Sequence, residues 1–213
     1  MPWELVIFDC DGVLVDSELL SNRVLAQMLA EVGLPMSVEA TIATFMGHTL
    51  PACIAVIEEG TGRPIPPTFV TDFRDRTFDA FRRELRPVAG IESVLEAIDL
   101  PFCVASSGPP EKIQLTLTVT GLLPRFAGRI FSAVEVARGK PHPDLFLHTA
   151  QQMGVAPTAC VVVEDSVRGV QAAVAAGMHV FGYADLTDAA VLAGAGAQVF
   201  RSMGELPELL KHP

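Results

Sequence analysis

Short apolar runs without polar interruption recur along this chain of 213 residues, and helical segments separate them. The first run is Leu5–Phe8, and similar runs occupy residues 102–105, 160–163 and 180–181, with a weaker one at 129–131. Runs of this kind are typical of strands that are buried on both faces of a parallel sheet. Because the strands alternate with helices, the sequence predicts an α/β doubly wound fold with a parallel sheet.

The segment after the first run has a different pattern. Apolar residues at helical spacing run through residues 17–33, and three further helices are expected at 37–46, 49–60 and 68–84, the first of them capped by Ser37. No strand pattern occurs in this stretch. We therefore expect a Rossmann-like α/β core of residues 1–16 and 88–213 and an inserted all-α domain of residues 17–87, with the return to the core at 87–90.

The chain is acidic, with 15 Lys and Arg residues against 25 Asp and Glu residues and a formal net charge of −10. Such a surface repels phosphate backbones, so nucleic acid is not an expected partner. The same acidity disfavours a phosphorylated ligand unless the site supplies its own positive charge. We expect no contact with a membrane and no signal peptide, because no apolar stretch reaches 18 residues and no basic segment precedes the first run.

The four cysteines lack metal-binding spacing and are expected to be reduced thiols of a cytoplasmic protein. No long exposed apolar stripe stands out in the sequence, so a monomer is expected.

Polar residues gather where predicted strands end and helices begin. The set is Asp9, Asp11, Ser106, Ser107, Gly108, Lys140, Glu164 and Asp165. In sheets of this kind ligands bind at the carboxyl ends of the strands, so these groups are expected to converge on one edge. Each signal alone has a plainer interpretation, since Asp-x-Asp can form a turn and Glu-Asp can cap a helix. Their joint occurrence in apolar surroundings favours a site.

The carboxylates of this set suit phosphoryl transfer. Mg²⁺ takes one or two carboxylates together with waters and phosphate oxygens, and Asp9 and Asp165 can supply the carboxylates. A carboxylate can also be the nucleophile that forms an aspartyl-phosphate. Asp11 lies two residues further along an extended chain and points the same way, so it can protonate the leaving oxygen and later activate water.

The remaining members of the set suit an anion. Ser106 and the backbone N–H groups of Ser107 and Gly108 open a helix, which is a favourable place for a phosphate. Lys140 can neutralise charge on the transferring phosphoryl group.

The stretch DCDGVLVDSE at residues 9–18 resembles the first motif, DxDGxxxDSE, of the haloacid dehalogenase superfamily. Ser106 matches the second motif of that family, Lys140 the third and Glu164-Asp165 the fourth, all in the family's order. The helical insert falls where the branch that contains β-phosphoglucomutase and sugar-phosphate phosphatases places its α-helical cap. The resemblance covers essentially the whole chain.

This resemblance implies a role for each matched residue. Asp9 is implied as the nucleophile and a Mg²⁺ ligand, and Asp11 as the general acid/base that also lends its backbone carbonyl to the metal. Asp165 is implied as the third protein ligand, with Glu164 supporting the metal site. The residues of the second and third motifs are implied to hold the phosphate. Because the second Asp separates phosphatases from dehalogenases, the expected substrate is a phosphate ester.

Phosphatases and mutases both occur in the branch that the chain resembles. The mutase uses a cap His at the position of Ser21, and a cap Arg shortly after a Gly, whereas the matching segment 47–50 (GHTL) has no Arg. An Arg of this kind recognises a second phosphate, so both departures favour a phosphatase. His48 is a candidate substrate-binding residue of the cap, although a lone His is more often a surface or core residue.

We therefore expect a Mg²⁺-dependent phosphatase that acts on a small phosphorylated sugar or sugar acid through phospho-Asp9. Its expected partner is this small phosphorylated metabolite. The alternatives are a phosphosugar mutase of the β-phosphoglucomutase type and a non-catalytic phosphosugar-binding protein.

Overall fold

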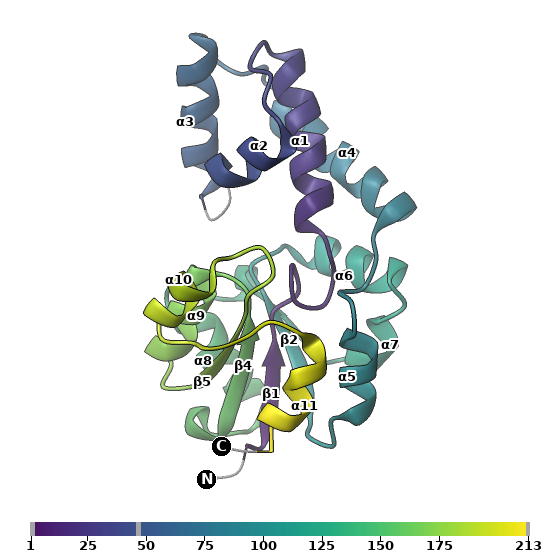
Figure 1. The fold of residues 1–213 in the computed structure, drawn as a ribbon, viewed down its shortest axis with the longest axis vertical. Coiled ribbons are helices and arrows are strands. Elements are labelled where there is room, and N and C mark those ends of the chain that lie inside the picture. Colours follow the sequence, from purple (N-terminus) through teal and green to yellow (C-terminus); the bar gives the residue numbers. More distant parts are fainter. Residues whose placement is uncertain (1–2, 46–47, 212–213) are drawn as a thin grey trace. The chain divides into compact units, whose positions relative to one another are not determined.

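The computed structural model describes residues 3–45 and 48–211 of the chain. The chain forms two compact units (Figure 1). The sheet unit comprises residues 1–16 and 86–213, and the helical unit comprises residues 17–85.

The return from the helical unit to the sheet unit comes two residues earlier than the boundary at residue 88 that the sequence suggested. Pro87 forms an isolated β-bridge with Val15. The Asp16 N–H donates to the Arg86 carbonyl at 3.0 Å. These backbone contacts attach Arg86 and Pro87 to the sheet unit.

The sheet unit is built on a six-stranded parallel sheet with the order β3-β2-β1-β4-β5-β6. The strands are β1 (Leu5–Phe8), β2 (Phe102–Ser106), β3 (Ile130–Ser132), β4 (Cys160–Glu164), β5 (His179–Tyr183) and β6 (Gln198–Phe200). The predicted α/β parallel-sheet core is confirmed. Several strands extend further toward their carboxyl ends than the apolar runs, so Ser106, Ser132 and Glu164 belong to strands.

Helices connect the strands and cover the sheet (Figure 1). They are α5 (Ile91–Ala97), α6 (Pro110–Val119), α7 (Leu123–Phe126), α8 (Asp144–Met153), α9 (Val167–Ala175), α10 (Ala189–Gly194) and α11 (Leu206–Leu209). Short 3₁₀ helices are η1 (Ala133–Glu135), η2 (Pro157–Ala159) and η3 (Met203–Glu205). Helices α6, α8 and α9 are among the helical segments that the sequence predicts between the apolar runs.

Strand β1 lies at the centre of the core, and all four of its residues are fully buried. Leu5 and Ile7 share one apolar cluster with residues of α8, α9 and α10. Phe8 makes edge-on contacts with Phe102 and with Phe126 of α7, at ring centroid distances of 6.2 and 6.4 Å. A strand covered on both faces needs apolar residues at every position, which explains the uninterrupted run.

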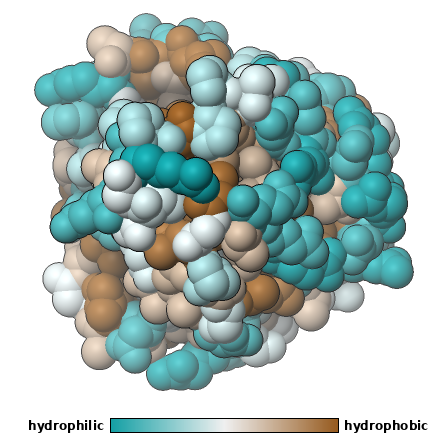
Figure 2. Space-filling view, turned by 90° about the horizontal axis from the view of Figure 1, so that it is seen from above, coloured by the Kyte–Doolittle hydropathy of each residue, from teal (hydrophilic) through white to brown (hydrophobic). Residues whose placement is uncertain are grey.

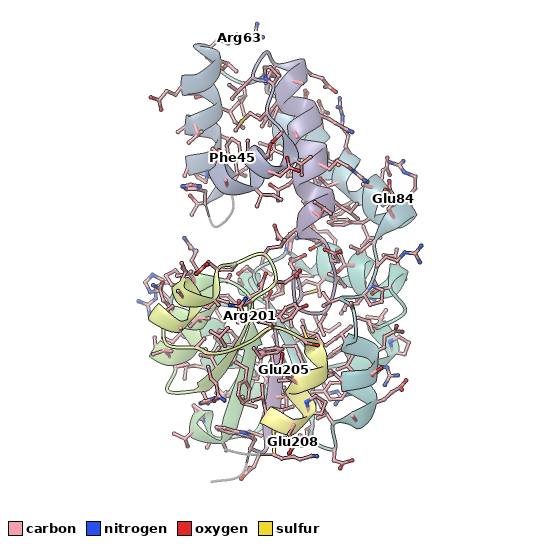
Figure 3. The ribbon with its side chains drawn as sticks, viewed as in Figure 1. Phe45, Arg63, Glu84, Arg201, Glu205 and Glu208 are labelled. Atoms are coloured by element: carbon pink, nitrogen blue, oxygen red, sulfur yellow. The ribbon has the colours of Figure 1, made fainter. Side chains whose placement is uncertain are left out.

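The described part of the helical unit consists of α1 (Glu18–Glu31), α2 (Val38–Phe45), α3 (Leu50–Thr61) and α4 (Phe69–Glu84). Its core contains Val24, Met28, Leu29, Ile57 and Phe45, the last of which is labelled in Figure 3. Ser37 caps α2 as predicted, because its Oγ accepts the Ala40 N–H at 3.1 Å. The end expected for this helix at Met46 lies outside the described residues.

Hydrophilic residues cover much of the face shown in Figure 2, with hydrophobic residues in smaller groups between them. Within residues 3–45 and 48–211, none of the helices combines the length and the apolar character that crossing a bilayer requires.

Candidate active site

Three charged side chains meet at the carboxyl edge of the sheet. Asp9 directly follows β1, Glu164 ends β4, and Lys140 lies in the loop before α8. The Lys140 Nζ donates to Asp9 Oδ1 and to Glu164 Oε1, each at 2.5 Å, and to the Ala105 carbonyl at 3.1 Å. Asp9, Lys140 and Glu164 are all buried. We call these three residues the buried triad.

The charges of the buried triad depend on one another. Burial raises the pKa of Asp9 to about 7, and the attraction of Lys140 opposes this shift while Glu164 and Asp11 add to it. Burial by itself lowers the pKa of Lys140, but the two neighbouring carboxylates outweigh it and leave that pKa above its ordinary value. All three N–H groups of the ammonium have acceptors. Removing Lys140 would therefore leave buried carboxylates without their partner, which is strongly destabilising.

Glu164 is held on both of its oxygens. While Oε1 faces Lys140, Oε2 accepts from the Asp165 N–H at 3.1 Å and from the N–H and Oγ of Ser166 at 3.0 and 2.9 Å. A methyl group added at Gly169 of α9 would lie 1.8 Å from Oε1. The small residue thus leaves room for the carboxylate against the helix, and Glu164 orients both Lys140 and the start of α9.

Asp11 lies in the turn after β1, opposite a lysine that the sequence analysis missed. Its Oδ2 accepts from the Nζ of Lys112, in the first turn of α6, at 2.8 Å, and the two side chains are largely buried. The neighbouring Gly12 has a positive φ of 76°, and a methyl group there would lie 2.1 Å from Asp165 Oδ2. This close approach places Asp165 beside the Asp11 turn. The only signal for Lys112 in the sequence is its place shortly after the strand-end serines.

Ser106 ends β2, and Ser107 and Gly108 follow it toward α6; we call these three residues the anion loop. The Gly108 N–H, which was expected to face an anion, instead donates to Ser106 Oγ at 3.1 Å. The next two residues are prolines, which have no N–H to donate. The Gly108 N–H and the two prolines therefore offer no amide hydrogen to an anion, whereas Lys140 and Lys112 supply positive charge at this edge.

The donor set fits a hard divalent cation. Asp9, Glu164 and Asp165 each present a carboxylate oxygen, and these oxygens lie within 4.8 Å of one another. Oxygen ligands of this kind suit Mg²⁺. Since both oxygens of Glu164 are engaged by neighbours, Asp9 and Asp165 are the better direct ligands. With Asp11 the edge carries four carboxylates against two ammonium groups, an excess of negative charge that a divalent cation balances.

The candidate residues fall in both units. The sheet unit contains the buried triad, Asp11, Asp165 and the anion loop. His48 belongs to the helical unit, where it is exposed and lies two residues before α3. Its neighbour Gly47 lies outside the described residues. Ser21, at the position of the mutase His, donates its hydroxyl to the Ser17 carbonyl within the same unit at 2.9 Å.

A family model described as haloacid dehalogenase-like hydrolase matches residues 6–183. The chain is 34% identical over 209 residues to the 6-phosphogluconate phosphatase of Escherichia coli K12, covering 98% of this chain and 95% of that protein.

Solved structures show the same fold over both units. A haloacid dehalogenase-like protein of unknown function from Agrobacterium tumefaciens matches with a TM-score of 0.90 and 36% identity, covering 98% of each chain. A hydrolase of this family from Deinococcus radiodurans R1, solved with bound phosphate and sodium, matches with a TM-score of 0.83 and 35% identity, covering 96% of this chain and 93% of that one.

Proposed function

The chain belongs to the haloacid dehalogenase-like hydrolases, and from that premise we propose that it is a Mg²⁺-dependent phosphatase that hydrolyses a small phosphorylated sugar or sugar acid through an aspartyl-phosphate at Asp9. The observation that carries the proposal is the buried triad with Asp11 beside it. A lysine-held carboxylate and a second acid, side by side at the end of the central strand, are the two groups that this reaction requires.

In the first half of the proposed reaction, a carboxylate oxygen of Asp9 attacks the phosphorus atom of the ester. The new bond to Asp9 forms as the bond from phosphorus to the sugar oxygen breaks. Lys140 holds Oδ1 of Asp9 at 2.5 Å and so fixes the orientation of the nucleophile. At this stage of the proposed cycle Asp11 carries the proton that it takes from water in the second half, and it gives this proton to the departing sugar oxygen, which leaves as a hydroxyl group.

In the second half, Asp11 is a carboxylate and takes a proton from water. The water oxygen attacks the phosphorus atom, the bond to Asp9 breaks, and inorganic phosphate leaves. Lys112 holds Asp11 through its Oδ2 at 2.8 Å, which keeps the acid/base group in place.

Charge on the phosphoryl group is met at the same edge. Mg²⁺ held by Asp9 and Asp165 would stabilise the charge that develops on the phosphoryl oxygens. Lys140 and the hydroxyl of Ser106 are the chain's own groups for binding these oxygens. One of the three acceptors of Lys140 gives way when Lys140 binds a phosphoryl oxygen, because all of its N–H groups already donate.

Phosphate release from a panel of sugar phosphates and phosphorylated sugar acids, with Mg²⁺ present, tests the proposed activity. We expect 6-phosphogluconate among the best substrates, since the E. coli relative is named for that activity. Conversion of a hexose 1-phosphate to the 6-phosphate without phosphate release would instead identify a mutase. If no ester of the panel releases phosphate, the result would favour the remaining alternative, a non-catalytic phosphosugar-binding protein.

The variant Asp9→Asn tests the assigned nucleophile. It should lower turnover by at least about a thousandfold, since the amide cannot form the phosphoenzyme. Asp99→Asn changes an exposed carboxylate of the same unit and should keep wild-type turnover. Wild-type activity in Asp9→Asn would refute the assignment.

A further inference from the structure

The anion loop is held by a residue that the mechanism above does not use. Ser132 ends β3, and it is the register partner of Ser106 at the end of β2. Its Oγ donates to the Gly108 carbonyl at 2.7 Å. Ser132 is buried, with 2% of its surface exposed, so the hydrogen bond is shielded from solvent.

Both polar backbone groups of Gly108 are therefore fixed by serine hydroxyls. The N–H donates to Ser106 Oγ at 3.1 Å, and the carbonyl accepts from Ser132. A glycine has the widest choice of backbone conformations, so these two bonds supply a restraint that the residue itself lacks.

This arrangement also decides how Ser106 can be used. A serine hydroxyl has one hydrogen to donate and two lone pairs to accept with. Because Gly108 occupies an acceptor position of Ser106, the hydroxyl hydrogen remains for another acceptor. A phosphoryl oxygen at the anion loop is such an acceptor.

Ser132 is itself anchored on its own side of the sheet. It begins η1, where its N–H donates to Glu135 Oε1 at 2.6 Å and its Oγ accepts the Val134 N–H at 3.3 Å. The other oxygen of Glu135 lies 3.2 Å from Nε2 of His148 on α8. The residue that restrains Gly108 is thus itself held in place by hydrogen bonds within η1 and by the contact of Glu135 with α8.

We propose that Ser132 is a positioning residue for the phosphoryl group, which holds Gly108 so that Ser106 presents its hydroxyl to the substrate. This inference rests on the proposed function, in which the phosphoryl group lies at the anion loop. The side-chain hydrogen bonds of Ser132 run to Gly108 and Val134, so in this proposal it acts on binding through the loop.

The chain offers a matched control for the test. Ser202 begins η3, and its N–H donates to Glu205 Oε1 at 2.8 Å, in the same Ser-x-x-Glu arrangement as Ser132 and Glu135 (Glu205 is labelled in Figure 3). Ser132→Ala and Ser202→Ala therefore both alter the start of a 3₁₀ helix. Thermal unfolding sets an assay temperature at which both variants are folded.

The experiment measures KM and kcat for 6-phosphogluconate with Mg²⁺, and the Kd of inorganic phosphate by calorimetry. Ser132→Ala should raise KM and the phosphate Kd about tenfold, the effect of losing one oriented hydrogen bond, while kcat changes much less. Ser202→Ala should match the wild type in all three. A Ser132→Ala variant that binds phosphate as tightly as Ser202→Ala would overturn the inference and leave the proposed function intact.

The same data separate the two proposals. If the wild type releases no phosphate from any ester, the proposed function fails, and the phosphate Kd alone judges the inference. Weaker phosphate binding by Ser132→Ala would then still support the positioning role. A wild type that neither releases phosphate from any ester nor binds phosphate would overturn both.

Discussion

Lys112 and Lys140 place positive charge at the candidate site of a chain that is acidic overall. A net charge of −10 disfavours phosphate in general. At the carboxyl edge of the sheet, however, Lys140 pairs with Asp9 and Glu164, and Lys112 pairs with Asp11. In the proposed function, the local charge at this edge and a bound divalent cation would offset the acidity of the remaining surface when a phosphate ester binds.

Lys112→Met tests whether this lysine holds the acid/base group. Without the bond to Oδ2 of Asp11, we expect kcat to fall about ten- to a hundredfold, within the range that a positioned acid/base contributes. Lys211→Met is the control, because it removes a lysine of similar reach whose pair with Glu208 is exposed. Steady-state kinetics of both variants give the comparison, and equal kcat values would show that Lys112 has no such role.

Gly169→Ala tests the close contact between α9 and the buried triad. The new methyl group would meet Oε1 of Glu164 at 1.8 Å, so the carboxylate must move and Lys140 must move with it. We expect a loss of about 2 kcal/mol in the free energy of unfolding, as for overpacking in a core, together with a large loss of turnover.

Gly194→Ala is the matched control for that substitution. Gly194 is also helical, but apart from its chain neighbours and the backbone of its own helix, no atom of the described residues lies within 4 Å of the position of an added methyl group. This variant should keep its activity and gain about 0.5 kcal/mol, because alanine restricts the unfolded chain. Equal stability and activity of the two variants in denaturant titrations and turnover assays would contradict the close contact.

At the scale of elements, the sequence predicted β1, β2, β4 and β5 because each contains a continuous apolar run, and β3 from a weaker run. Among the helices that it missed are α5 and α10. The first is only seven residues long, which is too short for a periodic pattern. The second, Ala189–Gly194, is almost entirely small or apolar and has no contrast between an apolar and a polar face. The spacing of apolar residues predicts a helix only when it repeats over several turns and separates an apolar face from a polar one.

Ser166 caps the start of α9 and also contacts Glu164 of the buried triad. Ser166 Oγ accepts the Gly169 N–H at 3.0 Å and donates to Glu164 Oε2 at 2.9 Å. Asp188 caps α10 in a comparable way, with its Oδ1 2.8 Å from the Ala190 nitrogen. Ser166→Ala and Asp188→Ala should each lower the free energy of unfolding by about 1 kcal/mol.

Only Ser166→Ala should also lower turnover, because only Ser166 contacts the buried triad. Denaturant titration and phosphate release, measured on both variants, separate the two effects. A loss of turnover in Asp188→Ala as large as that in Ser166→Ala would mean that any loss of stability in this unit reduces activity.

The candidate site was predictable from the sequence where a residue stands directly at a strand end. Asp9, Ser106 and Glu164 were singled out in this way. Lys112 was not, because a lysine in the first turn of a helix is usually a surface residue. Ser132 was not, because the apolar run before it, at 129–131, is the weakest of the five. Lys112 lies 101 residues from its partner Asp11, and Ser132 lies 24 residues from its partner Gly108. Only the folded chain brings such distant residues together.

At the scale of the whole molecule, the balance of charge at the site predicts a requirement for a divalent cation. Removing metal with a chelator should abolish phosphate release, and added Mg²⁺ should restore it. Mg²⁺ should also raise the midpoint of thermal unfolding, since it binds the folded state. Sodium chloride at the same ionic strength is the control for screening. Full activity in chelator would contradict the proposed metal site.

The central claim is that Asp9 carries the phosphoryl group between the two half-reactions. The most direct test mixes the protein with 6-phosphogluconate and Mg²⁺, quenches it in acid during turnover, and maps phosphorylation by mass spectrometry. The proposal predicts a phosphoryl group on Asp9 in the wild type and none in Asp9→Asn. Turnover with a phosphoryl group on another residue, or on none, would contradict it.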